Sequence, residues 1–215
     1  MEALLAFGAA LLALRLAGLL AARWRAKRAP NLLIVSSNGA GFDPVDVDAC
    51  TAAGVLVGNQ SGGNANSVAE HALGMMLTLS KRILESDRAL RREANVNRNA
   101  LIGNEVQGKT VGIVGIGNVG RRIAELCNGL LHMKVIAYDP YLTAEEIAAR
   151  GGEKVELHDL MRRSDFVSIS CPLTKDNRRM IGAREFALMQ PHAFFITTAR
   201  GFIHDERALA EALRT

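Results

Sequence analysis

The feature that most constrains the fold of this chain is a glycine-rich turn that lies between two short apolar runs. The run before the turn, Thr110 to Val114, is rich in β-branched residues and is typical of a fully buried parallel strand. The turn reads Gly115-Ile-Gly117-Asn-Val-Gly120, and apolar residues follow it at helical spacing. A second apolar run, from Lys134 to Tyr138, ends at Asp139. The stretch therefore predicts one strand, helix and strand unit.

The glycines of this turn have the spacing of a nucleotide-binding loop. Gly115 allows a tight turn, Gly117 lets the backbone approach a pyrophosphate, and Gly120 lets the helix pack close to the strand. The phosphates would then lie at the helix N-terminus, where N–H groups and the positive end of the helix dipole favour an anion. Asp139 follows Gly120 by 19 residues, which suits hydrogen bonds to the ribose hydroxyls and repels a 2′-phosphate. The pattern predicts a dinucleotide site that prefers NAD to NADP.

The positive charge of the chain is confined to its N-terminal segment. The formal net charge is +4, and residues 1–30 alone hold five Arg or Lys residues and one Glu. The rest of the chain is therefore neutral, so the sequence gives no indication of a nucleic-acid partner. Cys50, Cys127 and Cys171 are scattered without metal-ligand spacing. We expect reduced thiols, no metal site and a cytoplasmic protein.

Residues 1–30 differ in composition from the rest of the chain. Ala3 to Ala22 is rich in Leu and Ala, is long enough to span a bilayer and precedes a basic cluster. Arg15 interrupts the run, and a central arginine costs about 2.5 to 3.5 kcal/mol, close to what the eight leucines of the run return. The pattern favours a surface or interface helix, or a segment outside the native fold, over contact with a membrane.

Residues 31–98 predict part of a second domain in which strands and helices alternate. We expect buried strands at residues 31–37 and 55–57, each followed by a glycine-rich loop. Between the two strands, Asp43 is expected to cap a short helix that has Pro44 at its first position. This order is typical of an α/β domain with a parallel sheet.

A long helix is expected to connect this partial domain to the next one. Ser67 and Glu70 have the spacing of a capping box, and apolar residues continue behind them at helical spacing to about Arg92. We therefore place the boundary of the nucleotide-binding domain after this helix, so that the domain covers residues 99–215.

The loop at residues 38–43 is a candidate ligand site. It follows the carboxyl end of a predicted strand, where open α/β sheets bind their ligands. The backbone N–H groups of Ala40 and Gly41 can form a concave nest for a carboxylate. Plain turn chemistry explains the same residues, and the residues alone favour that simpler interpretation.

The alternation of strands and helices continues behind the glycine turn. We expect further strands at residues 154–157, 165–171 and 193–199, with helices between them. Arg200 follows the last of these strands directly, and a guanidinium at the carboxyl end of a strand can bind a carboxylate through two parallel hydrogen bonds. A surface arginine at a turn is the alternative interpretation. The order predicts an α/β domain with a doubly wound parallel sheet.

Five motifs occur in a fixed order along residues 31–215. They are Asn38 to Asp43, Asn64 to His71, the glycine turn with Asp139, Cys171-Pro172-Leu-Thr, and Thr197 to Gly201. Together they resemble the D-isomer-specific 2-hydroxyacid dehydrogenases, the family of phosphoglycerate, hydroxypyruvate and formate dehydrogenases. The resemblance implies a Rossmann-type NAD domain with part of a flavodoxin-like substrate domain, and a homodimer formed through the NAD domain.

The resemblance also assigns roles to individual residues. It implies hydride transfer between NAD and C2 of a small 2-hydroxy acid or its 2-keto form. Ala40, Gly41 and Asn64 would hold the substrate carboxylate, and Arg200 would bind that carboxylate and polarise the carbonyl. Besides the glycines of the turn, the cofactor contacts would come from Asn118, Val119, Asp139, Cys171, Pro172, Asn177, Thr198, Ala199 and Arg200.

The sequence departs from the family at one point that matters for catalysis. The family's catalytic histidine, its general acid and base, belongs to a segment beyond Thr215, and His204 stands at the position of an ordinary apolar residue. Loss of general acid–base help lowers a rate by about 10²- to 10⁴-fold. We therefore expect the 215-residue chain to turn over more slowly than about once per second. Two alternatives stay open: a non-catalytic NAD(H)-binding or oligomerisation module, and a product that does not fold stably.

Overall fold

The computed structural model describes residues 31–214, and the predictions for residues 1–30 lie outside this range. The chain divides into two compact units between Asn64 and Ala65. We call their described parts the N-terminal unit, residues 31–64, and the C-terminal unit, residues 65–214. This division precedes the long helix, whereas the boundary expected from the sequence follows it, and the assignment of residues 31–98 to a substrate domain stays a prediction.

The N-terminal unit is a small strand, helix and strand unit. Strand β1 (Ile34–Ser36) pairs in parallel with β2 (Leu56–Gly58), and α2 (Val47–Ala52) lies between them in the chain. Cys50 and Val55 are the buried centre of its apolar cluster.

The cap of helix α2 differs from the sequence prediction. Asp46 caps the helix by accepting a hydrogen bond from the N–H of Ala49 at 2.9 Å. Asp43 was expected in this role, but Val45 N–H donates to Phe42 O, so the residues around Pro44 form a turn that delays the helix. The prediction that Asp43 caps the helix was therefore wrong by one turn.

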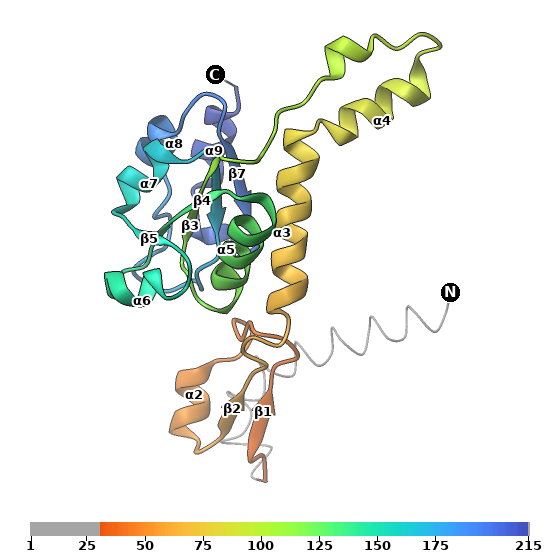
Figure 1. Ribbon diagram of the computed structural model, residues 1–215. Coiled ribbons are helices and arrows are strands. Elements are labelled where there is room, and N and C mark those ends of the chain that lie inside the picture. The colour runs from red at the N-terminus through yellow and green to blue at the C-terminus, as the bar shows by residue number, and fades with distance from the viewer. Residues whose placement is uncertain (1–30, 215) are drawn as a thin grey trace, which may run out of the picture. The chain divides into compact units, whose positions relative to one another are not determined.

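The C-terminal unit is a five-stranded parallel sheet with helices on both faces (Figure 1). The strand order is β5-β4-β3-β6-β7, so the chain winds outward from β3 in one direction and then in the other. This confirms the predicted doubly wound sheet. The strands are β3 (Thr110–Val114), β4 (Lys134–Tyr138), β5 (Glu153–Lys154), β6 (Phe166–Ile169) and β7 (Phe194–Thr197).

The side chains of the sheet alternate between two apolar layers. Val111 and Ile113 of β3 pack in one layer with α3 (Ala65–Ser80), α5 (Asn118–Leu131) and α6 (Ala144–Ala148). Val114 packs in the other layer, which includes residues of α7 (Leu157–Arg163), α8 (Ala183–Leu188) and α9 (Glu206–Ala212). Strand β3 is buried on both faces, as the continuous apolar run of its sequence predicts.

Element boundaries were predicted best around the glycine turn. Strands β3 and β4 have the predicted bounds. Strands β5, β6 and β7 are shorter than predicted.

The predicted long helix is in fact two helices. Helix α3 begins at Ala65 and ends at Ser80, and α4 (Ile83–Arg92) begins after Arg82, whose φ of 53° lies in the left-handed region. The Arg82 side chain holds the break by donating to Ala100 O at 2.6 Å and to Glu85. Ser67 and Glu70 lie within α3, so the expected helix start at Ser67 was wrong.

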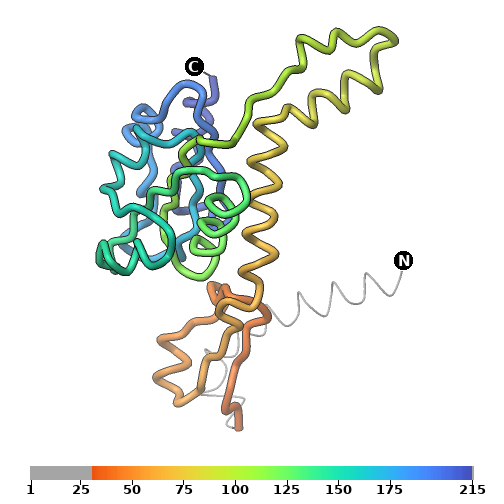
Figure 2. Tube along the Cα trace, in the orientation of Figure 1, coloured from red at the N-terminus to blue at the C-terminus, as the bar shows by residue number. Residues whose placement is uncertain are grey.

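The chain between Lys81 and Gly103 forms an arm that leaves the sheet and returns to the end of α3 (Figures 1 and 2). It contains α4 and the short 3₁₀ helix η1 (Arg98–Leu101). Ser80 closes the arm, because its hydroxyl donates to Asn104 O at 2.9 Å and its carbonyl accepts the N–H of Asn104 at 2.8 Å. Helix α4 buries no residue. No helix within residues 31–214 is long and apolar enough to cross a membrane.

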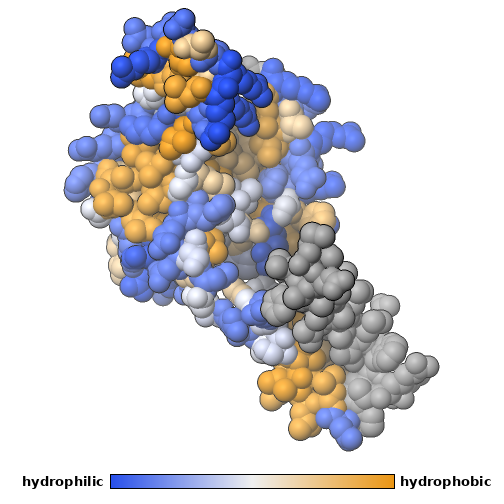
Figure 3. All heavy atoms as spheres, turned by 90° about the vertical axis from the view of Figure 1, so that its right-hand side faces the viewer, coloured by the Kyte–Doolittle hydropathy of each residue, from blue (hydrophilic) through white to orange (hydrophobic). Residues whose placement is uncertain are grey.

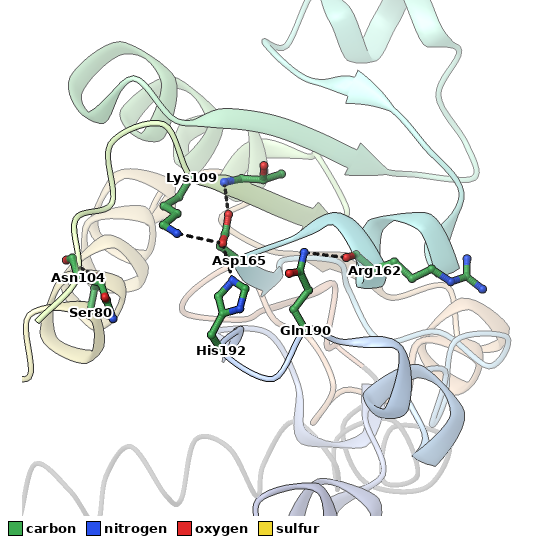
Figure 4. Close-up of polar contacts among 8 residues, drawn as sticks. Ser80, Asn104, Lys109, Arg162, Asp165, Gln190 and His192 are labelled. Atoms are coloured by element: carbon green, nitrogen blue, oxygen red, sulfur yellow. Dashed lines mark hydrogen bonds and ion pairs between the residues drawn. The ribbon is translucent and has the colours of Figure 1, made fainter.

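Asp165 connects the amino ends of three neighbouring strands of the sheet (Figure 4). Its carboxylate accepts the N–H of Thr110 at 2.8 Å, lies 2.8 Å from Nε2 of His192 and lies 3.6 Å from Nζ of Lys109. Thr110 begins β3, Asp165 precedes β6 and His192 precedes β7. Burial raises the pKa of this carboxyl, but the bonds from Thr110 and His192 and the charge of Lys109 outweigh burial, so its pKa is lowered from 3.8.

We predict that Asp165→Asn lowers the free energy of unfolding in a pH-dependent way. Because the folded pKa is lowered, the carboxylate contributes fully above its ordinary pKa of 3.8, and the contribution disappears as the pH falls through the folded value. Urea unfolding should show a loss of about 1 to 3 kcal/mol at pH 7, and the loss should be smaller at pH 3, below the ordinary pKa. The matched control is Asp87→Asn, which removes an exposed pair with Arg91 and should cost less than about 0.5 kcal/mol. An equal loss at both pH values would contradict the prediction.

Candidate cofactor site

The glycine turn lies at the carboxyl end of β3, in the middle of the sheet. Gly115 has a φ of 88°, and a Cβ atom on it would lie 2.6 Å from Cβ of Cys171. Its N–H donates to Tyr138 O at 2.9 Å, at the end of β4. The turn is thus packed between the ends of β4 and β6, and only glycine fits its first position.

The turn leads directly into helix α5. Gly117 is the N-cap residue, and a Cβ atom added to it would meet nothing within 4 Å. A Cβ atom on Gly120 would lie 2.2 Å from Gly115 O, so the first turn of the helix lies directly on the glycine turn. The N–H groups of the first helical turn, which includes Asn118 and Val119, have no acceptor within the helix. This end of α5 is suited to an anion.

Asp139 closes the turn on the side of β4. One carboxylate oxygen, Oδ2, accepts the N–H of Ile116 at 3.2 Å, and Oδ1 accepts the N–H of Tyr141 at 3.1 Å. A carboxylate oxygen has two lone pairs, so each oxygen can accept a further hydrogen bond from a ligand. Asp139 therefore both shapes the turn and remains able to bind ribose hydroxyls.

Asn177 orders the loop on the opposite side of the turn. Its amide donates to Pro172 O at 2.7 Å, and its Oδ1 accepts the N–H of Thr174 at 2.8 Å. The loop begins at Cys171, which directly adjoins Gly115. Burial raises the pKa of the Cys171 thiol to about 11, so the sulfur is a neutral thiol at physiological pH.

These segments enclose a cleft of about 360 Å³ at the carboxyl ends of β3, β4 and β6. From β3 the chain adds β4 and β5 on one side, and then β6 and β7 on the other side of β3. The sheet therefore has a switch point at β3, and open α/β sheets bind ligands at such a point. Six of the residues predicted to contact the cofactor line this cleft: Gly115, Gly117, Asp139, Cys171, Pro172 and Asn177. Tyr138, Tyr141 and Met180 also line it and were not predicted. Tyr138 and Tyr141 are close to Asp139 in the sequence, and this proximity was the only indication in the sequence that they line the cleft.

The predicted residues at the end of β7 do not line this cleft. Thr198, Ala199 and Arg200 follow β7, one strand further along the sheet. The Arg200 guanidinium donates to Ala199 O at 3.1 Å. The hydroxyl of Thr198 is buried and has no hydrogen-bond partner within residues 31–214. Asn118, Val119 and Gly120 belong to the first turn of α5.

The predicted substrate residues lie in the N-terminal unit. Ala40 O accepts a hydrogen bond from the Asn59 side chain at 2.8 Å, and Gly41 O accepts one from the Ser37 hydroxyl. The Asn59 contact holds the loop after β1 against the residues that follow β2, and the Ser37 contact lies within that loop. Asn64 is exposed at the last position of the unit.

His204 is buried and contacts the ring of Phe195, with 5.6 Å between the ring centroids. Its Nδ1 is buried without a hydrogen-bond partner in the described part of the chain. His204 also borders a second cavity of about 430 Å³, which Arg179, Phe202 and Arg207 line as well. In residues 31–214 we find no group of three His, Cys, Asp or Glu side chains placed to hold a metal ion.

Comparison with known proteins identifies the family. Residues 73–215 match the family model described as the NAD-binding domain of D-isomer-specific 2-hydroxyacid dehydrogenases. The chain is 42% identical over 188 residues to D-3-phosphoglycerate dehydrogenase of Mycobacterium leprae, covering 87% of this chain and 35% of the relative. It is 35% identical over 194 residues to glyoxylate reductase of Thermococcus litoralis, covering 87% of this chain and 58% of the relative.

A solved structure shows the same fold. D-lactate dehydrogenase from Aquifex aeolicus, complexed with NAD and lactic acid, is 31% identical and has a TM-score of 0.79, with 86% of this chain and 55% of that chain covered. The chain thus spans about a third of the phosphoglycerate dehydrogenase and slightly more than half of this structure. The chain belongs to the D-isomer-specific 2-hydroxyacid dehydrogenase family, and residues 73–215 match the model of that family's NAD-binding domain.

Proposed function

We propose that the chain functions in an NAD-dependent oxidoreductase that transfers a hydride between the cofactor and C2 of a D-2-hydroxy acid or its 2-keto form. The observation that carries this proposal is the cleft at the switch point of the sheet, which combines the glycine turn, the N-terminus of α5 and Asp139. NAD supplies the hydride acceptor when it is bound. The chain contributes the groups that bind the cofactor, orient it and select it against NADP.

The cofactor would lie along the carboxyl edge of the sheet. In this proposal, the N–H groups of Gly117, Asn118 and Val119 bind the pyrophosphate, and Asp139 binds the adenosine ribose. Cys171, Pro172 and Asn177 form the wall opposite Asp139. Thr198, Ala199 and Arg200 would bind the other half of the dinucleotide at the end of β7. The orphaned hydroxyl of Thr198 supports this, because a buried hydroxyl without a partner fits a ligand that completes its hydrogen bonds.

The substrate would be a small acid bound by its carboxylate. Arg200 would hold the carboxylate and polarise the carbonyl, and Ala40, Gly41 and Asn64 would contribute backbone and side-chain donors. The relatives named for phosphoglycerate, glyoxylate and lactate support a 2-hydroxy or 2-keto acid.

An activity assay separates this proposal from a non-catalytic NAD(H)-binding module. Because the chain is expected to turn over more slowly than about once per second, the assay uses a high protein concentration and long incubation. Even slow NADH consumption with glyoxylate or hydroxypyruvate, abolished by Arg200→Ala, would support the enzyme. NADH binding without any turnover of either acid would support the module.

We predict that Gly117→Ala weakens NADH binding without unfolding the protein. The methyl group has free space in the structure, but it occupies the surface that the pyrophosphate must approach. Titration calorimetry should show NADH binding at least about tenfold weaker, with a melting temperature within about 5 °C of the parent. By contrast, Gly115→Ala should lower the melting temperature further, because its φ is positive and Cys171 occupies the space. Parental NADH affinity in Gly117→Ala would contradict the proposed site.

We predict that Asp139→Asn reduces the preference for NADH over NADPH by about tenfold or more. The amide keeps an acceptor for the Ile116 N–H but removes the negative charge that repels a 2′-phosphate. Dissociation constants for both nucleotides test this. Asp176→Asn is the control, because it removes a negative charge from the same cleft on the side away from Asp139 and should leave the preference within about twofold.

We further propose a cytoplasmic homodimer in which the arm takes part. The cysteines at positions 50, 127 and 171 are free thiols, which suits a reducing compartment. Four large apolar side chains of the arm are 49% to 70% exposed: Ile83, Leu84, Leu90 and Ile102. Figure 3 shows one face of the molecule, on which hydrophobic residues lie among hydrophilic ones. Several exposed apolar side chains on one segment are typical of an interaction surface.

We predict that replacing both Leu84 and Leu90 with Glu produces a monomer. Two carboxylates cannot be buried without partners, so the apolar contact should be lost. Light scattering after size-exclusion chromatography measures the mass, and Leu213→Glu, an exposed leucine outside the arm, is the control. A parent that is already monomeric, or a double variant that stays dimeric, would contradict a dimer through the arm.

A further inference from the structure

Arg150 reaches the glycine turn from a distant part of the sequence. It follows α6, and its Nη1 atom donates a hydrogen bond to the carbonyl oxygen of Ile116 at 2.8 Å. Arg150 and Ile116 are 34 positions apart in the chain. Arg150 does not line the cleft, whereas Gly117, the residue after Ile116, does.

The position of Arg150 is fixed by the structure around it. Helix α6 begins with the capping box of Thr143 and Glu146. At its other end, the N–H groups of Arg150 and Gly152 both bond to Ile147 O, and Ile147 is fully buried. A Cβ atom on Gly152 would lie 3.4 Å from Cδ1 of Ile116, so this turn also packs against the Ile116 side chain. Arg150 is therefore held on a rigid support beside the glycine turn.

Two side chains fix two successive peptide planes of the glycine turn. Asp139 accepts the N–H of Ile116, which fixes the peptide between Gly115 and Ile116. Arg150 bonds to Ile116 O, which fixes the peptide between Ile116 and Gly117. In a trans peptide the C=O and N–H groups point in opposite directions. Holding the carbonyl toward α6 therefore turns the N–H of Gly117 away from α6.

We propose that Arg150 is a positioning residue that orients the Gly117 N–H toward the cofactor's pyrophosphate. Glycine adopts many backbone conformations, and a Cβ atom added to Gly117 would meet nothing within 4 Å. Without the bond from Arg150, the Ile116–Gly117 peptide samples orientations in which its N–H no longer faces the ligand. The inference rests on the proposed function of the cleft and adds a residue that acts through Ile116.

The test compares Arg150→Met with Arg150→Lys and with the control Arg163→Met. Methionine keeps an unbranched apolar stem without the donors of the guanidinium, and lysine restores one charged donor group. Arg163 is the last residue of α7 and pairs with exposed Glu153, so its loss removes an arginine without touching the glycine turn. The ligands are NADH, ADP and adenosine, because only the first two carry a pyrophosphate.

We expect Arg150→Met to weaken NADH and ADP by about tenfold, with adenosine unchanged within about twofold. Arg150→Lys should recover part of the loss, and Arg163→Met should bind all three ligands like the parent. Parental affinity for NADH and ADP in Arg150→Met, or an equal loss for adenosine, would overturn the proposal.

Spectra of the ligand-free protein keep the proposal testable even if the parent fails to bind NADH. With ¹⁵N-labelled glycine, the Gly117 amide signal should broaden or shift in Arg150→Met and stay parental in Arg163→Met. An unchanged Gly117 signal in Arg150→Met would overturn the role of Arg150. Failure of the parent to bind NADH would instead refute the proposed cofactor site.

Discussion

The architecture of the cofactor domain depends on the close packing of Gly120 against the carbonyl of Gly115. A Cβ atom on Gly120 would lie 2.2 Å from that oxygen, so any larger residue would push the start of α5 away from β3. The same approach places the first helical turn beside the ends of β4 and β6, where Asp139 and Cys171 meet the turn. One backbone contact thus determines where the helix N-terminus and the lining of the cleft come together.

The sequence predicted this part of the fold well because its signals are local. Strands β3 and β4 are continuous apolar runs, and each ends at a residue that cannot extend a buried strand, Gly115 or Asp139. The break at Arg82 had no such signal, since no glycine or proline marks it. It is stabilised by the contact of Arg82 with Ala100, which lies 18 positions further along the chain. The helix propensities of the residues around Arg82 favour an uninterrupted helix, but this tertiary contact outweighs them.

The same distinction applies to the cleft. Gly115, Gly117 and Asp139 follow from spacing within one unit, because neighbouring strands and their connecting helix fix where these residues lie. The order of the opposite loop depends on the Asn177 side chain, which the residues alone did not assign to it. The bond from Arg150 to Ile116 joins the residues after α6 to the turn after β3, 34 positions apart in the chain. Periodicity contains no information about such a contact, so only the folded structure could reveal it.

Cofactor preference and the order of the turn are coupled through Asp139. The carboxylate that would discriminate against a 2′-phosphate also accepts the N–H of Ile116. Replacing it with a small side chain would admit the phosphate but would also release the peptide between Gly115 and Ile116, leaving Arg150 as the side chain that still holds the turn. A change of specificity at this position therefore reduces affinity for any dinucleotide unless another acceptor takes over the Ile116 N–H. The acidic residue is thus constrained twice, by the ribose that it would bind and by the backbone that it shapes.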